Sequence, residues 1–232
     1  MAFNYSPKIV TDSILMYLDA GNPKSYSGSG TSFTDLSKNN YGFTLTNGPT
    51  FDSADNGSIV LDGTNDYIVS TTSFGLGSAM TYNFWLKCTT NANHQSIFSS
   101  GYQGSLGFVW FYRNLTNNAI LMQYSDGSTY VTTGSTYIGM WNGFNNLWIN
   151  ITVTVDYVGA SISWYRNGVL VSGPSALSTP VAPTTSFFRY ISTYNGTQYP
   201  FLGNISIVQL YSRILTDSEI LKNYNALKGR YL

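Results

Sequence analysis

Charged residues, cysteine and histidine are scarce in this 232-residue chain. It carries 11 Lys and Arg against 11 Asp and Glu, so its formal net charge is +0, and only 9% of its residues are charged, against about 25% in typical globular domains. A neutral chain lacks the basic surface that binds phosphate backbones, and we therefore expect no nucleic-acid partner. The single cysteine, Cys88, excludes an internal disulfide framework and a cysteine-based metal site.

A targeting or membrane-spanning segment is also missing from the sequence pattern. Residues Met1–Pro7 are polar and aromatic, without the basic and apolar regions of a signal peptide. The early apolar run Ile14–Leu18 ends at Asp19 and is far shorter than the ~20 residues that cross a bilayer. We therefore expect no membrane partner.

Strand patterns and turn signals, in contrast, fill most of the chain. Residues 149–156 alternate apolar and polar side chains, which is the period-2 pattern of a half-buried strand. Asn167-Gly168 joins two further apolar runs and predicts a hairpin with a type I′ turn. Many short strands separated by such turns indicate a two-sheet sandwich in a single domain.

One helix is predicted, near the end of the sequence. Thr216 and Glu219 match a capping box, in which each side chain bonds the backbone N–H of the other residue. Glu219 is the only glutamate in the chain and is therefore predicted as a helix cap rather than a catalytic group. The helix is expected to end at Gly229. Its predicted apolar face consists of Ile220, Leu221, Tyr224 and Leu227.

Several segments taken together resemble a known family. The opening Leu15–Tyr26 (LMYLDAGNPKSY), the segment Ile59–Tyr67 (IVLDGTNDY) and the ending Glu219–Tyr231 (EILKNYNALKGRY) follow one another in this order. The order resembles laminin-G-like, concanavalin A-like jelly-roll domains of the lectin-glucanase type, in the version encoded by tailed bacteriophages, cyanophages especially. The resemblance implies an all-β fold of two antiparallel sheets packed face to face, with one short C-terminal helix.

The residues that catalysis requires do not form a recognisable set. Glycoside hydrolases of this fold resemble one another in a Glu-x-Asp-x-Glu strand that supplies the nucleophile and the general acid, and no such strand exists here. Cys88 and His94 are predicted as a buried structural cysteine and a surface histidine. We therefore predict no enzyme activity, no catalytic residue and no cofactor.

Asp62 and Asp66 are the acidic residues that come closest to a metal site. They flank Gly63-Thr64-Asn65 and offer oxygen ligands of the kind that bind Ca²⁺ in the rim loops of laminin-G-like relatives. Ca²⁺ takes about six to eight oxygens, however, and no second acidic cluster completes the set. The simpler interpretation is a strand-end turn with Asx hydrogen bonds, and no metal ligand is predicted.

Two turn-rich aromatic loops are the candidate binding or contact surfaces. Aromatic faces can stack on the C–H groups of sugars while neighbouring amides bond the hydroxyls. The same aromatic residue types are enriched at protein interfaces, and in a β-sandwich they also fill the core. Core packing, an intersubunit contact and glycan binding are therefore open alternatives. The candidate residues are Trp141, Asn142, Phe144, Tyr194 and Tyr199.

The resemblance favours a non-catalytic structural protein of a phage virion. Such a protein would decorate the capsid or form a fibre-like appendage, acting through self-association into a homo-oligomer and docking on coat protein or other virion proteins. The alternative is a lectin-like module on the virion surface that binds surface glycans. Residues 1–12 are predicted as an N-terminal arm or first strand, and residues 13–232 as the jelly-roll domain.

Overall fold

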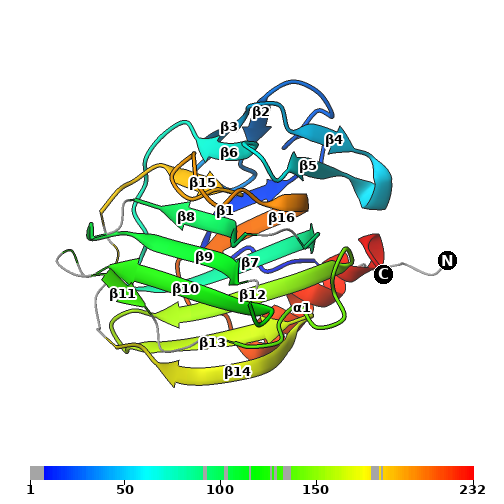
Figure 1. Ribbon diagram of the computed structural model, residues 1–232. Coiled ribbons are helices and arrows are strands. Elements are labelled where there is room, and N and C mark those ends of the chain that lie inside the picture. The colour runs from blue at the N-terminus through cyan, green and yellow to red at the C-terminus, as the bar shows by residue number, and fades with distance from the viewer. Residues whose placement is uncertain are drawn as a thin grey trace.

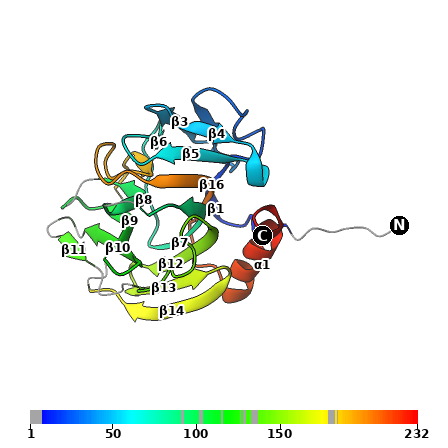
Figure 2. The same cartoon turned by 45° about the vertical axis from the view of Figure 1, so that its right-hand side comes forward.

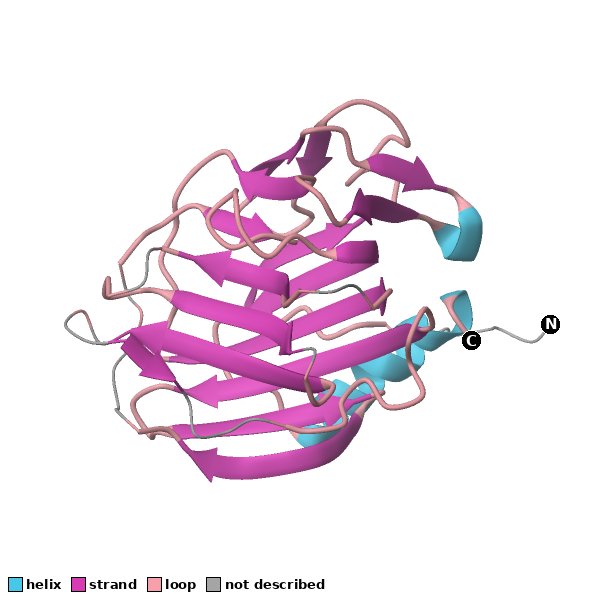
Figure 3. Cartoon of the chain, in the orientation of Figure 1, coloured by secondary structure: helices cyan, strands magenta, loops and turns pink. Residues whose placement is uncertain are grey.

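The computed structural model describes residues 8–90, 93–101, 104–114, 116–125, 127, 130–132, 137–178, 183 and 185–232. Within them the chain forms a sandwich of two antiparallel sheets with a helix near the C-terminal end (Figure 1), which confirms the fold class expected from the sequence. Figure 3 shows strands making up almost all of both layers, with the helical segments at one side of the sandwich.

The back sheet has eight strands. They are β1 (Ile14–Asp19), β4 (Thr50–Asp52), β5 (Ser58–Asp62), β7 (Ala79–Cys88), β12 (Trp148–Asp156), β13 (Ser161–Arg166), β14 (Val169–Ala176) and β16 (Leu202–Tyr211). Their order is β14-β13-β12-β7-β16-β5-β4, and β1 pairs with β16 beyond the stretch that β5 occupies. Strand β16 is therefore central, although it comes last in the sequence.

The front sheet also has eight strands. They are β2 (Ser32–Thr34), β3 (Gly42–Thr46), β6 (Tyr67–Ser70), β8 (Gln95–Ser100), β9 (Val109–Asn114), β10 (Ala119–Ser125), β11 (Tyr130–Thr132) and β15 (Arg189–Ile191). Their order is β11-β10-β9-β8-β15-β6-β3-β2. In Figure 1, β8, β9 and β10 lie nearest the viewer, with β7 and β12 behind them.

The main core lies between the two sheets and follows from alternation along the strands. In β12, the apolar residues at every second position from Ile149 to Val155 are fully buried in this core. The polar residues between them point to the opposite face, where Asn150 Nδ2 donates to Asn83 Oδ1 on β7 at 2.8 Å. The alternation therefore predicts the strand and its core-facing residues correctly, but β12 is not half-buried as expected, because its polar face is buried as well.

The predicted hairpin turn is also confirmed. Asn167 and Gly168 connect β13 to β14, and their φ angles are 52° and 79°. A type I′ turn requires positive φ at both central residues, which Asn and Gly tolerate best.

The C-terminal helix α1 (Asp217–Leu227) begins as the capping box predicts. Thr216 Oγ1 accepts a hydrogen bond from Glu219 N at 3.3 Å, and Glu219 Oε2 accepts one from Thr216 N at 2.9 Å. The helix ends two residues before Gly229, which lies in a 3₁₀ turn, η2 (Lys228–Arg230), and a second such turn, η1 (Ala54–Asn56), precedes β5. Leu221 is exposed rather than part of the apolar face. No helix in the described part of the chain is long and apolar enough to cross a bilayer.

Helix α1 and the residues after it form a third layer on the outer face of the back sheet (Figure 2). The ring of Trp85 on β7 stacks with the rings of Tyr224 and Tyr231, with centroid distances of 5.6 and 4.3 Å. Stacked aromatic pairs add to the hydrophobic gain of burial. These contacts cover the outer face of the back sheet around β7.

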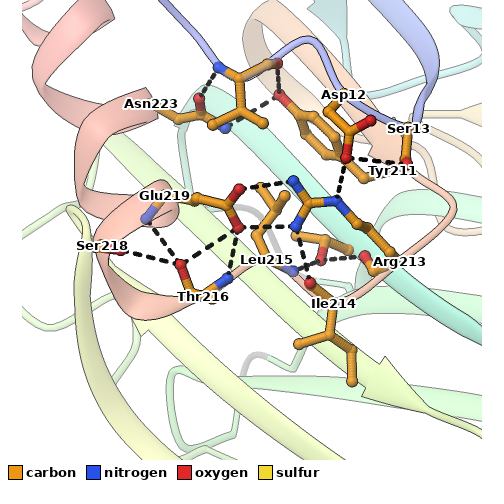
Figure 4. A network of polar contacts seen from close by, with 12 residues as sticks. Asp12, Ser13, Tyr211, Arg213, Ile214, Leu215, Thr216, Ser218, Glu219 and Asn223 are labelled. Atoms are coloured by element: carbon orange, nitrogen blue, oxygen red, sulfur yellow. Dashed lines mark hydrogen bonds and ion pairs between the residues drawn. The ribbon is translucent and has the colours of Figure 1, made fainter.

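The segment before β1 packs against its own domain (Figure 4). Val10 is buried, its backbone N–H donates to Asn223 Oδ1 at 2.7 Å, and its carbonyl accepts from Tyr211 Oη at 3.0 Å. Arg213 Nε donates to Asp12 Oδ2 at 3.0 Å. Residues 8–12 form no strand, and the remainder of the predicted arm, residues 1–7, lies outside the described residues.

An ion pair joins the two segments that carried much of the family resemblance. Arg230 Nη1 and Nη2 donate to the two carboxylate oxygens of Asp19, each at 2.9 Å. Gly21 lies beside this pair, and a Cβ there would meet Asn56 O at 1.7 Å and Arg230 Nη2 at 2.2 Å. The glycine is therefore required by the close approach of neighbouring backbone and guanidinium rather than by its own φ.

Candidate functional site

The structure places Trp141 in the core. Its side chain is 2% exposed, and the guanidinium carbon of Arg113 lies 5.1 Å from the centroid of its ring. A buried ring has no free face to stack on a sugar or on another subunit. Of the three alternatives left open for Trp141, the structure therefore supports core packing, and its candidate role in glycan binding or an intersubunit contact is corrected: its turn-rich surroundings suggested exposure, but a buried arginine from β9 covers it.

The two neighbours of Trp141 lie closer to the surface. Asn142 is exposed, and Phe144 is half-buried with the guanidinium of Arg166 at 5.4 Å from its ring. This loop joins the main core through Trp141, whereas Tyr194 belongs to a separate cluster. The structure therefore does not bring the two predicted loops together into one site.

The second predicted loop folds into a small hairpin against the front sheet. Tyr194 N donates to Gln198 O at 2.8 Å, and Gln198 N donates back to Tyr194 O at 3.2 Å. Ser96 N on β8 then donates to Tyr199 O at 2.8 Å and fastens the end of the hairpin to the sheet. In Figure 1 the orange segment after β15 loops across the front sheet beside β8.

This hairpin adds its two tyrosines to aromatic residues of the front sheet. Trp110 stacks with Tyr112 and Tyr199 at centroid distances of 4.0 and 5.1 Å, and its ring lies 4.9 Å from Tyr194. His94 contacts the rings of Tyr112 and Tyr199 at 5.5 and 6.0 Å. We call this group of five residues the front-face aromatic cluster.

Alternation along β9 explains why Trp110 and Tyr112 face outward. Val109 and Phe111 point into the main core, so the residues beside them point to the other face of the sheet. Trp110 Nε1 donates to Ser96 Oγ at 3.0 Å, and this bond fixes the indole on the surface of the sheet. The sequence interpretation missed Trp110 and Tyr112, for which the aromatic run Val109–Arg113 was a signal, and it did not connect His94 with them.

Tyr199 is the residue of the cluster that presents its ring to solvent. It is 37% exposed, whereas Trp110 and Tyr112 are each 6% exposed. Its φ angle is 54°, in the left-handed region that bulky residues avoid at a cost of about 1–3 kcal/mol. The surrounding hydrogen bonds hold Tyr199 in this conformation, with its ring over Trp110.

The predicted roles of Cys88 and His94 can be compared with their surroundings. Cys88 is fully buried, as expected, and burial raises the pKa of its thiol to about 11 although the nearby Arg113 opposes this shift. Arg113 Nη1 donates to Cys88 Sγ at 3.1 Å. A protonated, inaccessible thiol is a poor nucleophile. His94 is half-buried in the aromatic cluster rather than fully at the surface.

Asp62 and Asp66 form the turn that the sequence predicts. Asp62 Oδ1 accepts from Thr64 N at 2.8 Å and from Asn65 N at 3.3 Å, and Asp66 Oδ2 accepts from Asp62 N at 3.2 Å. The bond from Thr64 N lowers the pKa of Asp62, whereas burial raises the pKa of Asp66. Among the residues described, no group of three or more His, Cys, Asp or Glu side chains could hold a metal ion.

A cleft of about 1050 Å³ lies elsewhere, between the N-terminal segment, β1 and the end of α1. Its lining combines apolar side chains with polar ones, among them two lysines and an aspartate. Its position, away from the front-face aromatic cluster, makes it a separate surface. The lining residues are Lys8, Ile9, Thr11, Asp12, Ser13, Ile14, Tyr17, Asn22, Leu36, Ser37, Lys38, Ala226 and Leu227.

Comparison with known proteins identifies the family. A model of the concanavalin A-like lectin/glucanases superfamily, of the laminin G type, matches residues 62–221, more than half of the chain. The chain belongs to this superfamily. The matched residues include the whole front-face aromatic cluster, whereas strands β1–β4 and the end of α1 lie outside the match. The comparison with curated proteins finds no match.

Solved structures of the same fold include receptor-binding domains of botulinum neurotoxins. The type G domain superposes with a TM-score of 0.67 at 17% identity, covering 92% of this chain and 51% of that chain. The C/D mosaic domain gives a TM-score of 0.69 at 15% identity, covering 93% and 51%. The serotype D domain in complex with N-acetylneuraminic acid gives 0.66 at 14%, covering 93% and 51%.

This chain spans about half the length of these neurotoxin chains. Identities of this size show a shared fold alone. The family match agrees with the lectin-type fold that the sequence resemblance implied. The phage origin that it also implied stays a prediction.

Proposed function

We propose that this chain is a non-catalytic carbohydrate-binding domain whose sugar-contacting surface is the front-face aromatic cluster. The observation that carries the proposal is Tyr199, an exposed ring that the hydrogen bonds of a tight hairpin hold over Trp110 in spite of a strained backbone. Strain of this kind persists where the surroundings over-determine a conformation, and it is typical of binding sites. A rigid aromatic ring flanked by polar groups is also what a sugar-binding site requires.

The superfamily membership supports this proposal, because lectins share the fold. Among the neighbours of similar fold, a serotype D neurotoxin domain is described in complex with N-acetylneuraminic acid. Another neurotoxin binding domain is described in complex with rat synaptotagmin II, so protein receptors are a further precedent for this fold. The sugar-bound neurotoxin domain and the aromatic surface of this chain both support carbohydrate binding.

Binding to a glycan array by the wild type and by two variants tests the proposal. Tyr199→Gly removes the ring but retains the left-handed backbone without strain, and Phe144→Ala removes the corresponding aromatic of the other predicted loop. Loss of a central aromatic contact costs about 2 kcal/mol, or roughly 30-fold in Kd. We expect this loss in Tyr199→Gly and none in Phe144→Ala.

Thermal unfolding of each variant separates lost binding from lost structure. The proposal is contradicted if Tyr199→Gly binds as well as the wild type while both are folded. Loss of binding in Phe144→Ala alone would assign the sugar site to the loop that contains Asn142 instead.

Self-association, the mode of action predicted for a virion subunit, has one observation in its favour. Strand β14 is at the edge of the back sheet, and its residues Val169 and Leu170 are exposed. Exposed apolar edges are sites where sheets pair with other chains. Light scattering should show an oligomer that Val169→Lys dissociates, and a monomeric wild type would contradict this role. Location in a virion and a coat-protein partner remain proposals from the sequence resemblance.

A further inference from the structure

The outer face of the front sheet carries no cationic side chain in the described part of the chain. All 11 Lys and Arg residues lie in that part, and only Arg113 and Arg189 belong to front-sheet strands. Both point inward: Arg113 is 1% exposed with its guanidinium over Trp141, and Arg189 is 0% exposed with its guanidinium over Phe74. The alternation that buries them turns their neighbours Tyr112 and Tyr190 outward.

The other nine cations lie on the back sheet, around α1 or in loops outside the front-sheet strands. Two of them, Lys8 and Lys38, line the cleft beside the N-terminal segment. Lys87 lies on β7 with its ammonium group 5.4 Å from the ring of Trp148. The positive charge of the molecule is therefore gathered away from the front-face aromatic cluster. These nine residues are Lys8, Lys24, Lys38, Lys87, Arg166, Arg213, Lys222, Lys228 and Arg230.

Acidic groups are missing from the same face. The eight front-sheet strands contain no Asp or Glu. Asp66, next to the start of β6, is buried and accepts a bond from the Asp62 backbone, and Asp126 lies outside the described residues. Apart from the tyrosines, His94 is the one titratable side chain within the cluster.

Uncharged hydrogen-bonding groups, in contrast, surround the exposed ring of Tyr199. Thr197 and Gln198 are exposed at the hairpin, and Ser96 Oγ lies beside Trp110. His94 Nδ1 is buried and has no hydrogen-bond partner in the structure. The exposed groups of Thr197 and Gln198 can replace the water around sugar hydroxyls, whereas a buried atom such as His94 Nδ1 is out of the reach of a ligand.

For an anionic sugar, the cost of desolvation at this surface would exceed the attraction. Its carboxylate or sulfate loses hydration on binding at a cost of several kcal/mol, and only a cation or several aligned N–H donors offset that cost. We infer, on the basis of the proposed function, that the front-face aromatic cluster binds neutral glycans and discriminates against sialylated, uronate-bearing and sulfated ones. In this respect it differs from the neurotoxin domain that is described with N-acetylneuraminic acid.

The test uses an array of neutral glycans printed beside their sialylated, sulfated and uronate-bearing counterparts. Each neutral ligand should bind at least tenfold more tightly than its charged counterpart, and its Kd should stay constant between about 0.05 and 0.5 M NaCl because no ion pair is screened. Equal or tighter binding of the charged member, weakened by salt, would overturn the inference while the proposed function stands. Binding of no glycan, or binding unchanged in Tyr199→Gly, would remove the proposed function and the inference with it.

A gain-of-charge variant provides a matched control. Thr197 is exposed at the tip of the hairpin, so Thr197→Lys places one cation beside Tyr199, and Thr197→Gln adds a neutral side chain of similar reach. Thr197→Lys should improve binding of the charged glycans several-fold in a salt-dependent manner, whereas Thr197→Gln should not. An unchanged preference in Thr197→Lys would show that the missing cation is not what excludes acidic sugars.

Discussion

The ion pair between Asp19 and Arg230 allows a quantitative prediction about stability. Removing one partner of a buried pair costs about 3–5 kcal/mol, because the other charge stays buried without compensation. After Arg230→Ala, the Asp19 carboxylate would keep two donors, Tyr17 Oη and Gly21 N, each at 3.0 Å. We therefore expect the lower end of the range, about 3 kcal/mol, which corresponds to a fall in Tm of roughly 6–12 °C.

Urea denaturation followed by circular dichroism measures this loss, since urea, unlike guanidinium chloride, does not screen charges. Lys24→Ala, at an exposed position, is the matched control and should leave the midpoint unchanged. Adding Asp19→Asn to Arg230→Ala should restore part of the stability, because a neutral amide replaces the uncompensated charge. The reasoning would be refuted if Arg230→Ala lost less than about 1 kcal/mol of unfolding free energy, as expected for an exposed ion pair. It would also be refuted if the double variant were no more stable than Arg230→Ala.

Three further predictions concern stability. Hydrogen bonding by Arg213 lowers the pKa of Glu219 from 4.5 to about 2. The ionised carboxylate therefore stabilises the fold above pH 4.5, and this stabilisation is lost as the pH falls toward 2. In a pH series of thermal melts, Glu219→Gln should reduce this dependence of Tm on acid. Gly21→Ala overpacks its site and should lower the free energy of unfolding, measured by urea denaturation, by at least about 1–3 kcal/mol. Gly229 has open space around it, so Gly229→Ala should leave the free energy of unfolding unchanged. Burial lowers the pKa of Arg189 to about 10, and two of its guanidinium nitrogens have no hydrogen-bond partner. Because a buried charge that is poorly satisfied costs stability, Arg189→Met should raise the urea concentration at the unfolding midpoint.

Each of these expectations has a contrary result. If Tm falls with decreasing pH equally in Glu219→Gln and in the wild type, the interaction of the Glu219 carboxylate with Arg213 does not stabilise the fold. A tolerated Gly21→Ala would mean that the backbone beside it can move apart. Destabilisation by Arg189→Met would mean that the guanidinium is better satisfied than its hydrogen bonds indicate.

Features set by local interactions could be predicted from the sequence. The turn at Asn167-Gly168 and the capping box of Thr216 and Glu219 each depend on residues within a few positions of one another, and both are present. The alternation of residues 149–156 likewise requires no knowledge of the rest of the chain. Such signals were sufficient for the fold class and for the position of the helix.

The candidate site could be predicted only in part, because its residues meet through distant pairings. Trp141 has the polar, turn-rich neighbours of an exposed residue, and only the fold shows Arg113 packed over it. The run from Val109 to Tyr112 is apolar and aromatic throughout, and Arg113 after it lies on the buried face, so no polar residue distinguishes the two faces. The covering hairpin with Tyr199 comes from a part of the sequence far from Trp110, so their contact had no local signal.

The central position of β16 has a consequence for how the domain is made. Strands β1, β5 and β7 all pair with β16, yet β16 is synthesised after every other strand in the described part of the sandwich. Until residue 211 has been synthesised, the back sheet remains in separate pieces with unpaired edges. Contacts of such long sequence separation slow folding, and open edges invite pairing with other chains. The nascent chain is therefore most exposed to aggregation just before β16 is synthesised.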